Sequence, residues 1–349
     1  MDRKYRVLIV DDSAFIRQFL TEILNRSAEL EVVATASDPT KAVELLKVKE
    51  FDVITLDIEM PNMDGLAFLS YLMRSNPKPV VVISVWTQKN SNAAVKALSL
   101  GAVDVIAKPS IGYKEGMSIL EVEIIDKVVA AAKAKVVRTV IMDHPPLKTE
   151  LNKTTAVGGA DRIIAIGAST GGTVAVGQIF KNLNPDIPGV LIIQHMPAIF
   201  TAAFAKTLDE SSRLRVKEAE NGEELSKGTA LVVPGGRSLA LKKTGSKYIV
   251  KVGPPVISSV YNPSIDFTLL SIAAEVGSNA MGVILTGMGD DGARGLKAMY
   301  ESGAYTVAQD EKSSVVYGMP HKALEFGGVR KVLALDEVAR AINKWASTY

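Results

Sequence analysis

The sequence contains no cysteine, which excludes disulfide bonds, thiolate metal sites and a cysteine nucleophile. It also lacks long apolar runs: stretches such as VLIIQ and GVILT end far short of the roughly 20 residues that a membrane-spanning helix needs. No basic stretch is dense, and 40 basic against 38 acidic residues leave a formal net charge of only +2. Nucleic acid is therefore not an expected partner, and we expect a soluble protein without direct membrane insertion.

The amino terminus, MDRKYRVLIVDDSAF, lacks the apolar stretch and the small-residue cleavage site of a signal peptide. We therefore expect a cytoplasmic location. With 349 residues, of which 47% are hydrophobic, the chain exceeds the usual size of a single hydrophobic core. Two globular domains are predicted.

Short β-branched runs alternate with helical patterns in the first part of the chain: RVLIV, VVATA, VITLD, VVVIS and VDVIA. A second alternation starts at RIIAI and continues through VLIIQ, ALVVP, GVILT and YTVAQ, with a predicted hairpin from SLALKK through Thr244 and Gly245 into KYIVKV. The first helical pattern has one apolar face, made of Phe15, Ile16, Phe19, Leu20, Ile23 and Leu24. These alternations predict the α/β class, with two doubly wound parallel-sheet domains, the first flavodoxin-like and the second Rossmann-like.

Between the two alternations the pattern dissolves into VVRTVIMDHPPLKTELNKTTAVGGAD. Its Pro145-Pro146 and Gly158-Gly159 pairs are typical of a linker. The predicted organisation is a first domain over residues 1–125, a linker over 126–160 and a second domain over 161–349.

Acidic residues follow two of the strands in the first domain. Asp11 and Asp12 come after the first strand, and Asp57 ends the third. Parallel sheets bind ligands at the carboxyl ends of their strands, so these acids are expected to lie together. One carboxylate, Asp57, is then placed to attack phosphorus, while the others hold Mg²⁺ with the backbone carbonyl of Glu59 as a further ligand.

Two more polar residues end strands at the same edge. Lys108 lies in the string AKPS, where its ammonium is placed to pair with phosphoryl oxygens, and the hydroxyl of Ser84 is placed to donate to them. Any single acid at a strand end is more often a loop cap, but this combination is not explained in that way. The strings VLIVDDS, LDIEMPNMDG and AKP resemble the receiver domains of two-component response regulators.

The receiver resemblance implies that Asp57 is the phosphorylated residue, that Asp11 and Asp12 bind the metal, and that Ser84 and Lys108 act as the phosphoryl switch. Many receivers carry an aromatic switch residue about three positions before the lysine. This sequence has Val105 there instead, so its route of signal transmission differs from that pattern.

In the second domain, Gly167-Ala168-Ser169-Thr170-Gly171 follows a strand and fits the G-x-S-x-G nucleophile turn. Flanking glycines permit a sharp strand-to-helix turn, and the free N–H groups at the start of the helix are able to hold an oxyanion. Taken alone, the motif is equally typical of phosphate binding or a tight connection. It is neither a P-loop nor a dinucleotide fingerprint.

Histidine is scarce, and this favours the nucleophile interpretation. A serine hydroxyl needs a base that titrates near neutral pH, and the sequence has three histidines. His144 falls in the linker and His321 in GMPHKAL, whereas His195 directly follows the strand VLIIQ. Although a lone histidine at a strand end is commonly a structural polar residue, His195 is the best placed to act on Ser169.

A third member, a carboxylate, would orient the imidazole. GVILTGMGDDGARG offers Asp290 and Asp291, and residue reasoning alone does not choose between them. The strings IGASTGG, QHMPAIFTAAFA, LTGMGDDGA and AQDEKSSVVYGMP resemble the catalytic domain of the chemotaxis protein-glutamate methylesterase family. That resemblance implies that Asp291 is the catalytic acid, and that Thr170 and Met288 contribute to oxyanion binding and to the shape of the pocket.

The family resemblance covers nearly the whole chain outside the linker, and it implies a phosphorylation-activated serine esterase. The implied substrates are glutamate methyl esters on methyl-accepting chemoreceptors, with deamidation of receptor glutamines as a second activity. The implied phosphodonor is the chemotaxis histidine kinase, with Mg²⁺ needed for phosphorylation and no cofactor for ester hydrolysis.

Two other functions remain as alternatives. A response regulator with a DNA-binding output half requires a helix-turn-helix or a basic face, and the residues after 160 have neither. An inactive hydrolase domain that serves as a phosphorylation-gated interaction module is opposed, though not excluded, by the presence of Ser169, His195 and Asp291.

Overall fold

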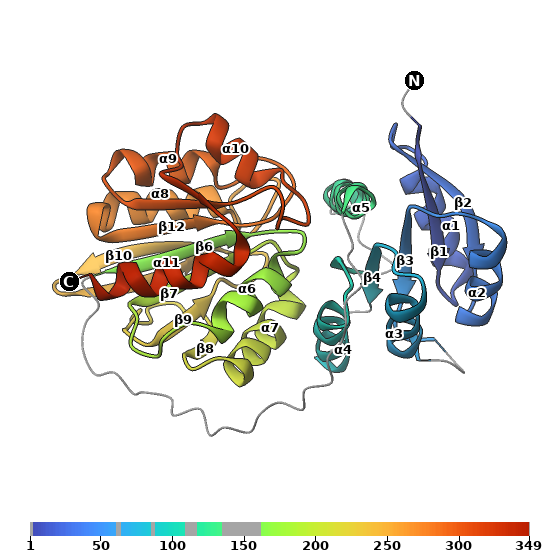
Figure 1. Ribbon diagram of the computed structural model, residues 1–349, viewed down its shortest axis with the longest axis horizontal. Coiled ribbons are helices and arrows are strands. Elements are labelled where there is room, and N and C mark those ends of the chain that lie inside the picture. The colour runs from blue at the N-terminus through green and yellow to red at the C-terminus, as the bar shows by residue number, and fades with distance from the viewer. Residues whose placement is uncertain (1–2, 61–63, 85–87, 109–116, 135–161, 349) are drawn as a thin grey trace. The chain divides into compact units, whose positions relative to one another are not determined.

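The computed structural model describes residues 3–60, 64–84, 88–108, 117–134 and 162–348. The chain forms two compact units, residues 1–143 and 144–349 (Figure 1). The last helix of the first unit, α5 (Met117–Lys133), continues past residue 125 into the segment predicted as linker. Most of that segment, with His144 and the two prolines, lies outside the described residues, so the domain limits stay a prediction.

The first unit is a five-stranded parallel sheet in the order β2-β1-β3-β4-β5. All five predicted strands are confirmed: β1 (Tyr5–Val10), β2 (Leu30–Ala36), β3 (Val53–Asp57), β4 (Val80–Ser84) and β5 (Asp104–Ala107). The helices are α1 (Ala14–Leu24), α2 (Pro39–Val48), α3 (Gly65–Ser75), α4 (Gln88–Ser99) and α5, with α1 packed beside α5 and α3 beside α4. Because the strands are parallel, their carboxyl ends meet at one edge.

Helix α1 begins after Ser13, whose hydroxyl accepts a hydrogen bond from the N–H of Ile16. Its buried side chains are Ile16, Leu20, Ile23 and Leu24, as predicted. The inclusion of Phe15 in the buried face was wrong, because its side chain is 58% exposed. It stacks instead on Phe19, with ring centroids 6.4 Å apart, at the border of the apolar stripe.

The second unit is a seven-stranded sheet in the order β14-β13-β12-β6-β7-β9-β8, and every pairing in it is parallel. The strands are β6 (Ile163–Ala168), β7 (Gly189–Gln194), β8 (Arg215–Glu218), β9 (Thr229–Val232), β12 (Ala280–Ile284), β13 (Tyr305–Gln309) and β14 (Lys331–Leu333). The edge strands β8 and β14 were not predicted, since they are short and carry charged residues. The chain order reverses at β6, which makes this the switch point where α/β sheets bind ligands.

Six α-helices accompany this sheet: α6 (Gly172–Lys181), α7 (Ala198–Ser211), α8 (Ile265–Glu275), α9 (Ala293–Glu301), α10 (Met319–Glu325) and α11 (Leu335–Ser347). A short 3₁₀ turn, η1 (Gly277–Asn279), precedes β12. The predicted hairpin is confirmed as the antiparallel pair β10 (Ser238–Thr244) and β11 (Lys247–Gly253). Throughout the described ranges, every helix is too short or too polar to cross a membrane.

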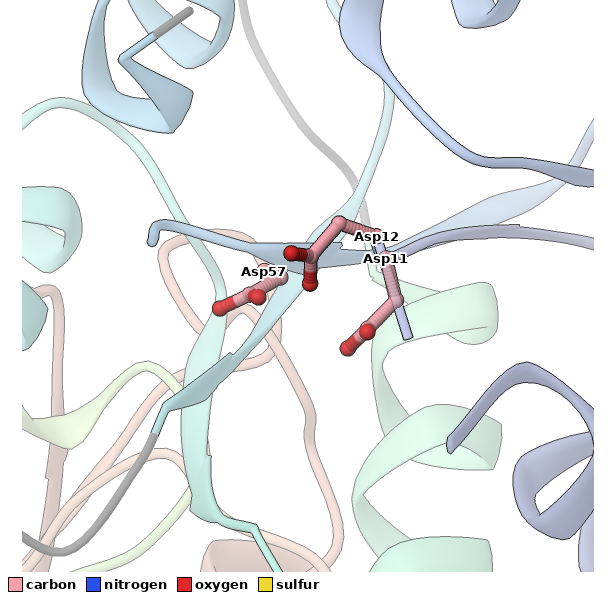
Figure 2. Close-up of side chains that lie close together, drawn as sticks. All are labelled: Asp11, Asp12 and Asp57. Carbon is pink, nitrogen blue, oxygen red and sulfur yellow. The ribbon is translucent and has the colours of Figure 1, made fainter. Parts of the chain in front are cut away.

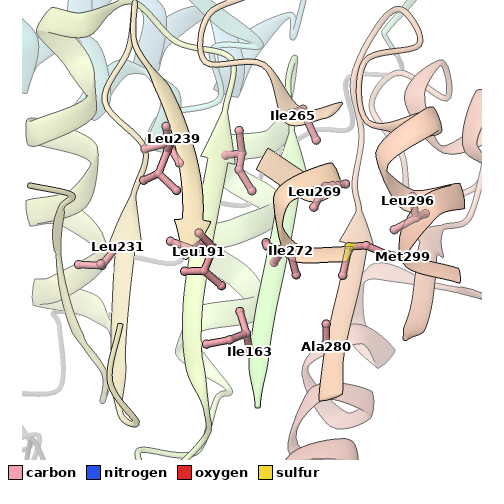
Figure 3. Close-up of a cluster of buried hydrophobic side chains, with 14 of the residues drawn as sticks. Ile163, Leu191, Leu231, Leu239, Ile265, Leu269, Ile272, Ala280, Leu296 and Met299 are labelled. Carbon is pink, nitrogen blue, oxygen red and sulfur yellow. The ribbon is translucent and has the colours of Figure 1, made fainter. Parts of the chain in front are cut away.

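The core of the second unit fixes the position of α8. Ile265, Leu269 and Ile272 on this helix are fully buried, and they belong to one cluster with Leu191 of β7 and Leu239 of the hairpin (Figure 3). Burying a side chain of this size contributes roughly 1.5–3 kcal/mol. The cluster therefore holds the amino terminus of α8 rigidly at the edge of the sheet where β6 and β7 end.

Candidate active site and phosphoryl site

Ser169 lies directly after β6, in a turn that its neighbours hold tightly. Its N–H donates to the carbonyl of Thr286 at 3.0 Å, and its own carbonyl accepts from the N–H of Gly172 at 2.7 Å. The turn passes through Gly171, which has φ +78° and precedes α6. A side chain there would be strained and would collide with Val315. Gly171 therefore serves the turn that presents Ser169, as the sequence predicts.

Gly287 faces Ser169 from the segment that follows β12. An added Cβ would lie 2.7 Å from the Cβ of Ser169 and would collide with the sulfur of Met319. We expect Gly287→Ala to lower the free energy of unfolding by about 1–3 kcal/mol and to reduce activity, because Ser169 must shift. Gly177→Ala in α6 meets no atom within 4 Å and is expected to be neutral or stabilising. Denaturant unfolding of both variants tests this, and wild-type stability with full activity in Gly287→Ala would contradict it.

His195 leaves β7 at the same level as Ser169 leaves β6, because Ala168 and Gln194 are paired in the sheet. The N–H of His195 donates to the carbonyl of Ala168 at 3.0 Å. The imidazole is buried, and its Nε2 lies 2.8 Å from Oδ2 of Asp291. The other ring nitrogen, Nδ1, has no hydrogen-bond partner in the part of the chain that the structure describes. One imidazole nitrogen is thus held by a carboxylate, and the other is buried without a hydrogen-bond partner among the described residues.

Asp291 is fixed by the amino terminus of α8. Its carboxylate accepts from the N–H groups of Ile265 at 2.8 Å and Asp266 at 2.9 Å, and from the hydroxyl of Ser264 at 3.2 Å. Burial raises its pKa, but the contact with His195 and these backbone N–H groups outweigh burial and leave the pKa below its ordinary value. Asp290 is exposed, so of the two adjacent acids the structure brings Asp291 to the histidine.

The aromatic ring over His195 was missed by sequence reasoning. Tyr261 stacks on the imidazole with centroids 4.5 Å apart and an interplanar angle of 14°. It belongs to the loop between β11 and α8, where the hydroxyl of Ser259 accepts from the N–H of Tyr261 and donates to its carbonyl. The string YNPSID, which also supplies the cap residue Ser264, was the available signal.

The remaining residues that the sequence singled out for this site differ in how deeply they are buried. Thr170 is buried, and its carbonyl accepts from the hydroxyl of Thr286 at 2.9 Å. Met288 is half-buried and follows Gly287, which contacts Ser169. Their part in oxyanion binding stays a prediction. His321 lies on α10 with its side chain 53% exposed, beside Glu325 rather than in a buried site.

In the first unit, the predicted acids converge at the carboxyl edge of the sheet. Carboxylate oxygens of Asp11, Asp12 and Asp57 lie within 4.8 Å of one another (Figure 2). Lys108 joins two of them, with its Nζ 2.6 Å from Asp57 and 2.8 Å from Asp11. Burial raises the pKa of Asp57 to about 6, although Lys108 and the N–H of Glu59 oppose that rise. Three acids with one cation leave a surplus of negative charge, which suits a hard cation with oxygen ligands.

Two further receiver residues lie in β4 and β5. The hydroxyl of Ser84 is buried without a hydrogen-bond partner among the described residues, so it is available to a ligand oxygen. Val105 is buried in β5, and its carbonyl accepts from the ammonium of Lys127 at 2.8 Å. Lys127 also lies 3.1 Å from Asp104, so a buried ion pair ties α5 to β5 where many receivers have an aromatic switch. The N–H of Glu59 donates to Asp57 at 3.1 Å, while the metal role of its carbonyl stays a prediction.

Comparison with known proteins assigns a family to each of the two units. Residues 164–342 match the CheB methylesterase family model, and residues 7–121 match the response regulator receiver domain. The chain is 47% identical to a protein-glutamate methylesterase/protein-glutamine glutaminase of Geobacter metallireducens, over 97% of this chain and 95% of that protein. It is 46% identical to the protein of that name from Salmonella typhimurium, with the same coverage.

A solved structure gives the same result for the second unit. The Thermotoga maritima CheB methylesterase catalytic domain is 36% identical with a TM-score of 0.51, and the match covers 54% of this chain and 99% of that one. The two family matches follow each other in the chain as the two units do. The chain therefore belongs to the CheB methylesterase family, with a response regulator receiver domain in front of its methylesterase domain.

Proposed function

We propose that the chain hydrolyses glutamate methyl esters on chemoreceptors through Ser169, His195 and Asp291, and so serves adaptation in chemotaxis. The observation that carries this proposal is the buried His195–Asp291 pair beside the nucleophile turn. The second imidazole nitrogen, Nδ1, has no hydrogen-bond partner among the described residues. Relatives that share nearly the whole chain are named for the esterase and the glutaminase activity. Release of methanol from methylated receptor membranes tests the proposal, and its absence in the wild-type protein would contradict it.

In the first half of the reaction, Nδ1 of His195 takes the proton of the Ser169 hydroxyl as Oγ attacks the γ-carbonyl carbon of the ester. The carbonyl oxygen becomes an oxyanion, which N–H groups near Thr170 and Met288 stabilise. The intermediate collapses when His195 returns its proton to the methoxy oxygen. Methanol leaves, and the glutamyl group remains bound to Ser169 as an acyl-enzyme.

In the second half, a water molecule gives a proton to His195 while its oxygen attacks the acyl carbonyl. Oγ of Ser169 then leaves with the proton from His195, and the receptor glutamate is released. Throughout, the negative charge of Asp291 stabilises the imidazolium that forms on His195. The same steps cleave a glutamine side-chain amide, with ammonia as the leaving group. Ammonia release from receptors that carry glutamine tests this second activity.

Tyr261 stacks on the ring of His195, and its π face favours the imidazolium. We expect Tyr261→Ala to lower kcat about tenfold, which corresponds to about 1.4 kcal/mol of transition-state stabilisation. Tyr261→Phe keeps the ring and is expected to stay within about twofold of the wild type. Steady-state kinetics separates a fall in kcat from a rise in KM. A Phe variant as impaired as the Ala variant would show that ring stacking is not the cause.

In the receiver, we propose that Asp57 attacks the phosphorus of a phosphohistidine on the chemotaxis kinase, whose histidine nitrogen leaves. Mg²⁺, held by Asp11, Asp12 and Asp57 with the carbonyl of Glu59, supplies charge neutralisation for the transferring group when bound. Lys108 pairs with the phosphoryl oxygens, and the buried hydroxyl of Ser84 donates to one of them. A cytoplasmic location belongs to the same proposal.

The domain order supports autoinhibition, in which the unphosphorylated receiver restrains the esterase. To shift the ratio of active to restrained protein from 1:99 to 99:1, phosphorylation must change the free energy between these two states by about 5.5 kcal/mol. Partial activation is therefore expected. Deletion of the whole first unit, residues 1–143, is then expected to raise basal methanol release severalfold. A fall in activity in a folded deletion variant would instead mean that the receiver acts mainly as an activator.

A further inference from the structure

A large cavity lies in the methylesterase domain, far from Ser169. Its volume is about 1070 Å³, and its walls come from α11 and from the residues just before four neighbouring strands. Arg162 precedes β6, Asn279 precedes β12, Gly303 lies near the start of β13, and Arg330 precedes β14. Ser169 follows the opposite end of β6, which spans six residues or about 20 Å. The cavity is therefore separate from the esterase site.

Positive charge is concentrated in this cavity. Five basic side chains line it, against one acidic side chain, Glu337: Arg162, Arg330, Lys331, Arg340 and Lys344. The whole chain has only a formal net charge of +2, so the local excess is not a property of the composition. Within the described residues, Arg330, Lys331, Arg340 and Lys344 form no ion pair, and Glu337 accepts from the N–H of Ala334 at the start of α11.

Two of the guanidinium groups are held by aromatic rings. Arg162 lies 3.6 Å from the ring centroid of Trp345 and donates to the carbonyl of Trp345 at 2.7 Å. The guanidinium of Arg330 lies 5.5 Å from the ring centroid of Tyr300 and 6.0 Å from that of Tyr305. Such contacts restrict the rotamers of a long side chain before any ligand binds, which lowers the entropy cost of binding. Planar guanidinium groups in fixed positions suit the paired oxygens of phosphate.

We propose that this cavity binds a small polyphosphate anion, of the nucleoside polyphosphate or inorganic polyphosphate class. The concave shape favours a small molecule over a flat protein surface, and the volume exceeds what a single phosphate would fill. Several uncompensated cations match the three or four charges of a triphosphate. The opposite edge of the sheet, where Ser169, His195 and Asp291 lie, is left open to the ester.

Trp345 lines the cavity and provides a direct reporter. The chain has two tryptophans, so Trp86→Phe leaves Trp345 as the sole indole fluorophore. In this full-length variant, titration with inorganic triphosphate and with ATP is expected to change Trp345 fluorescence in a saturable way. Equal affinity for the two means that the phosphates alone are recognised, and tighter binding of ATP means that the base contributes.

Charge reversal tests the assignment to this cavity. Arg340→Glu with Lys344→Glu, both exposed on α11, is expected to weaken triphosphate binding at least about tenfold. The matched control, Lys227→Glu with Lys251→Glu, changes two exposed lysines outside the cavity by the same charge and is expected to bind as before. Equal weakening in both double variants, or a fluorescence change with a polyglutamate peptide but not with triphosphate, would overturn the proposal.

Discussion

Replacing Ser169 with alanine is expected to reduce methanol release by about a millionfold, to the level that binding and oxyanion stabilisation alone provide. The side chain that is removed is the proposed nucleophile. Folding is expected to stay intact, because the contacts of Ser169 that the structure gives are made by its backbone N–H and carbonyl. The assay is methanol release from methylated receptor membranes, with thermal unfolding measured in parallel.

Ser258→Ala is the matched control for Ser169→Ala. Ser258 is exposed in the loop that carries Tyr261, and it lines a cavity beside Asp291. Its loss is expected to leave methanol release unchanged. Near wild-type release by Ser169→Ala would mean that another group is the nucleophile and would remove the basis of the proposed function.

Asp291→Asn is expected to have the second largest effect, a loss of about ten-thousandfold in kcat. A neutral amide does not stabilise the imidazolium of His195, and it disturbs the tautomer that the reaction needs. Asp290→Asn changes the neighbouring acid, which is exposed and lacks the contact with His195, and is expected to retain activity. Equal losses in the two variants would show that the charge of the loop matters rather than the contact of Asp291.

The lowered pKa of Asp291 also predicts a dependence of stability on pH. An acid whose folded pKa is depressed stabilises the folded state fully above its unfolded value, here 3.8, and loses this effect as pH falls through the folded pKa. The gap in stability between wild type and Asp291→Asn is therefore expected to narrow at strongly acidic pH. Denaturant unfolding at neutral and acidic pH measures that gap.

The sequence allowed us to predict that Ser169 and His195 lie at the same edge of the sheet, because parallel strands end at one edge. Ser169 and His195 follow β6 and β7, which pair in parallel and are buried along their whole length. The choice of Asp291 over Asp290 was beyond residue reasoning, since adjacent residues share the same loop. That choice depends on the N–H groups at the start of α8, whose position comes from the packing of its buried face.

Tyr261 was unpredictable for a related reason. It lies 66 residues after His195 in the chain, in an irregular loop whose path is fixed by local hydrogen bonds rather than by periodicity. In the receiver, the acids at the strand ends were predictable from the same edge rule. The Lys127–Asp104 ion pair behind Val105 was not, because a helical lysine is exposed in most sequences and here is buried against β5.

The most direct test of the proposed function is to measure methanol release from methylated receptor membranes by the wild type and by Asp57→Asn. Each protein is assayed with and without a phosphodonor. The phosphodonor is expected to raise methanol release by the wild type and to have no effect on Asp57→Asn, whose basal release persists. Equal stimulation of both proteins, or no stimulation of a wild type shown to be phosphorylated, would contradict the claim that phosphorylation at Asp57 gates hydrolysis at Ser169.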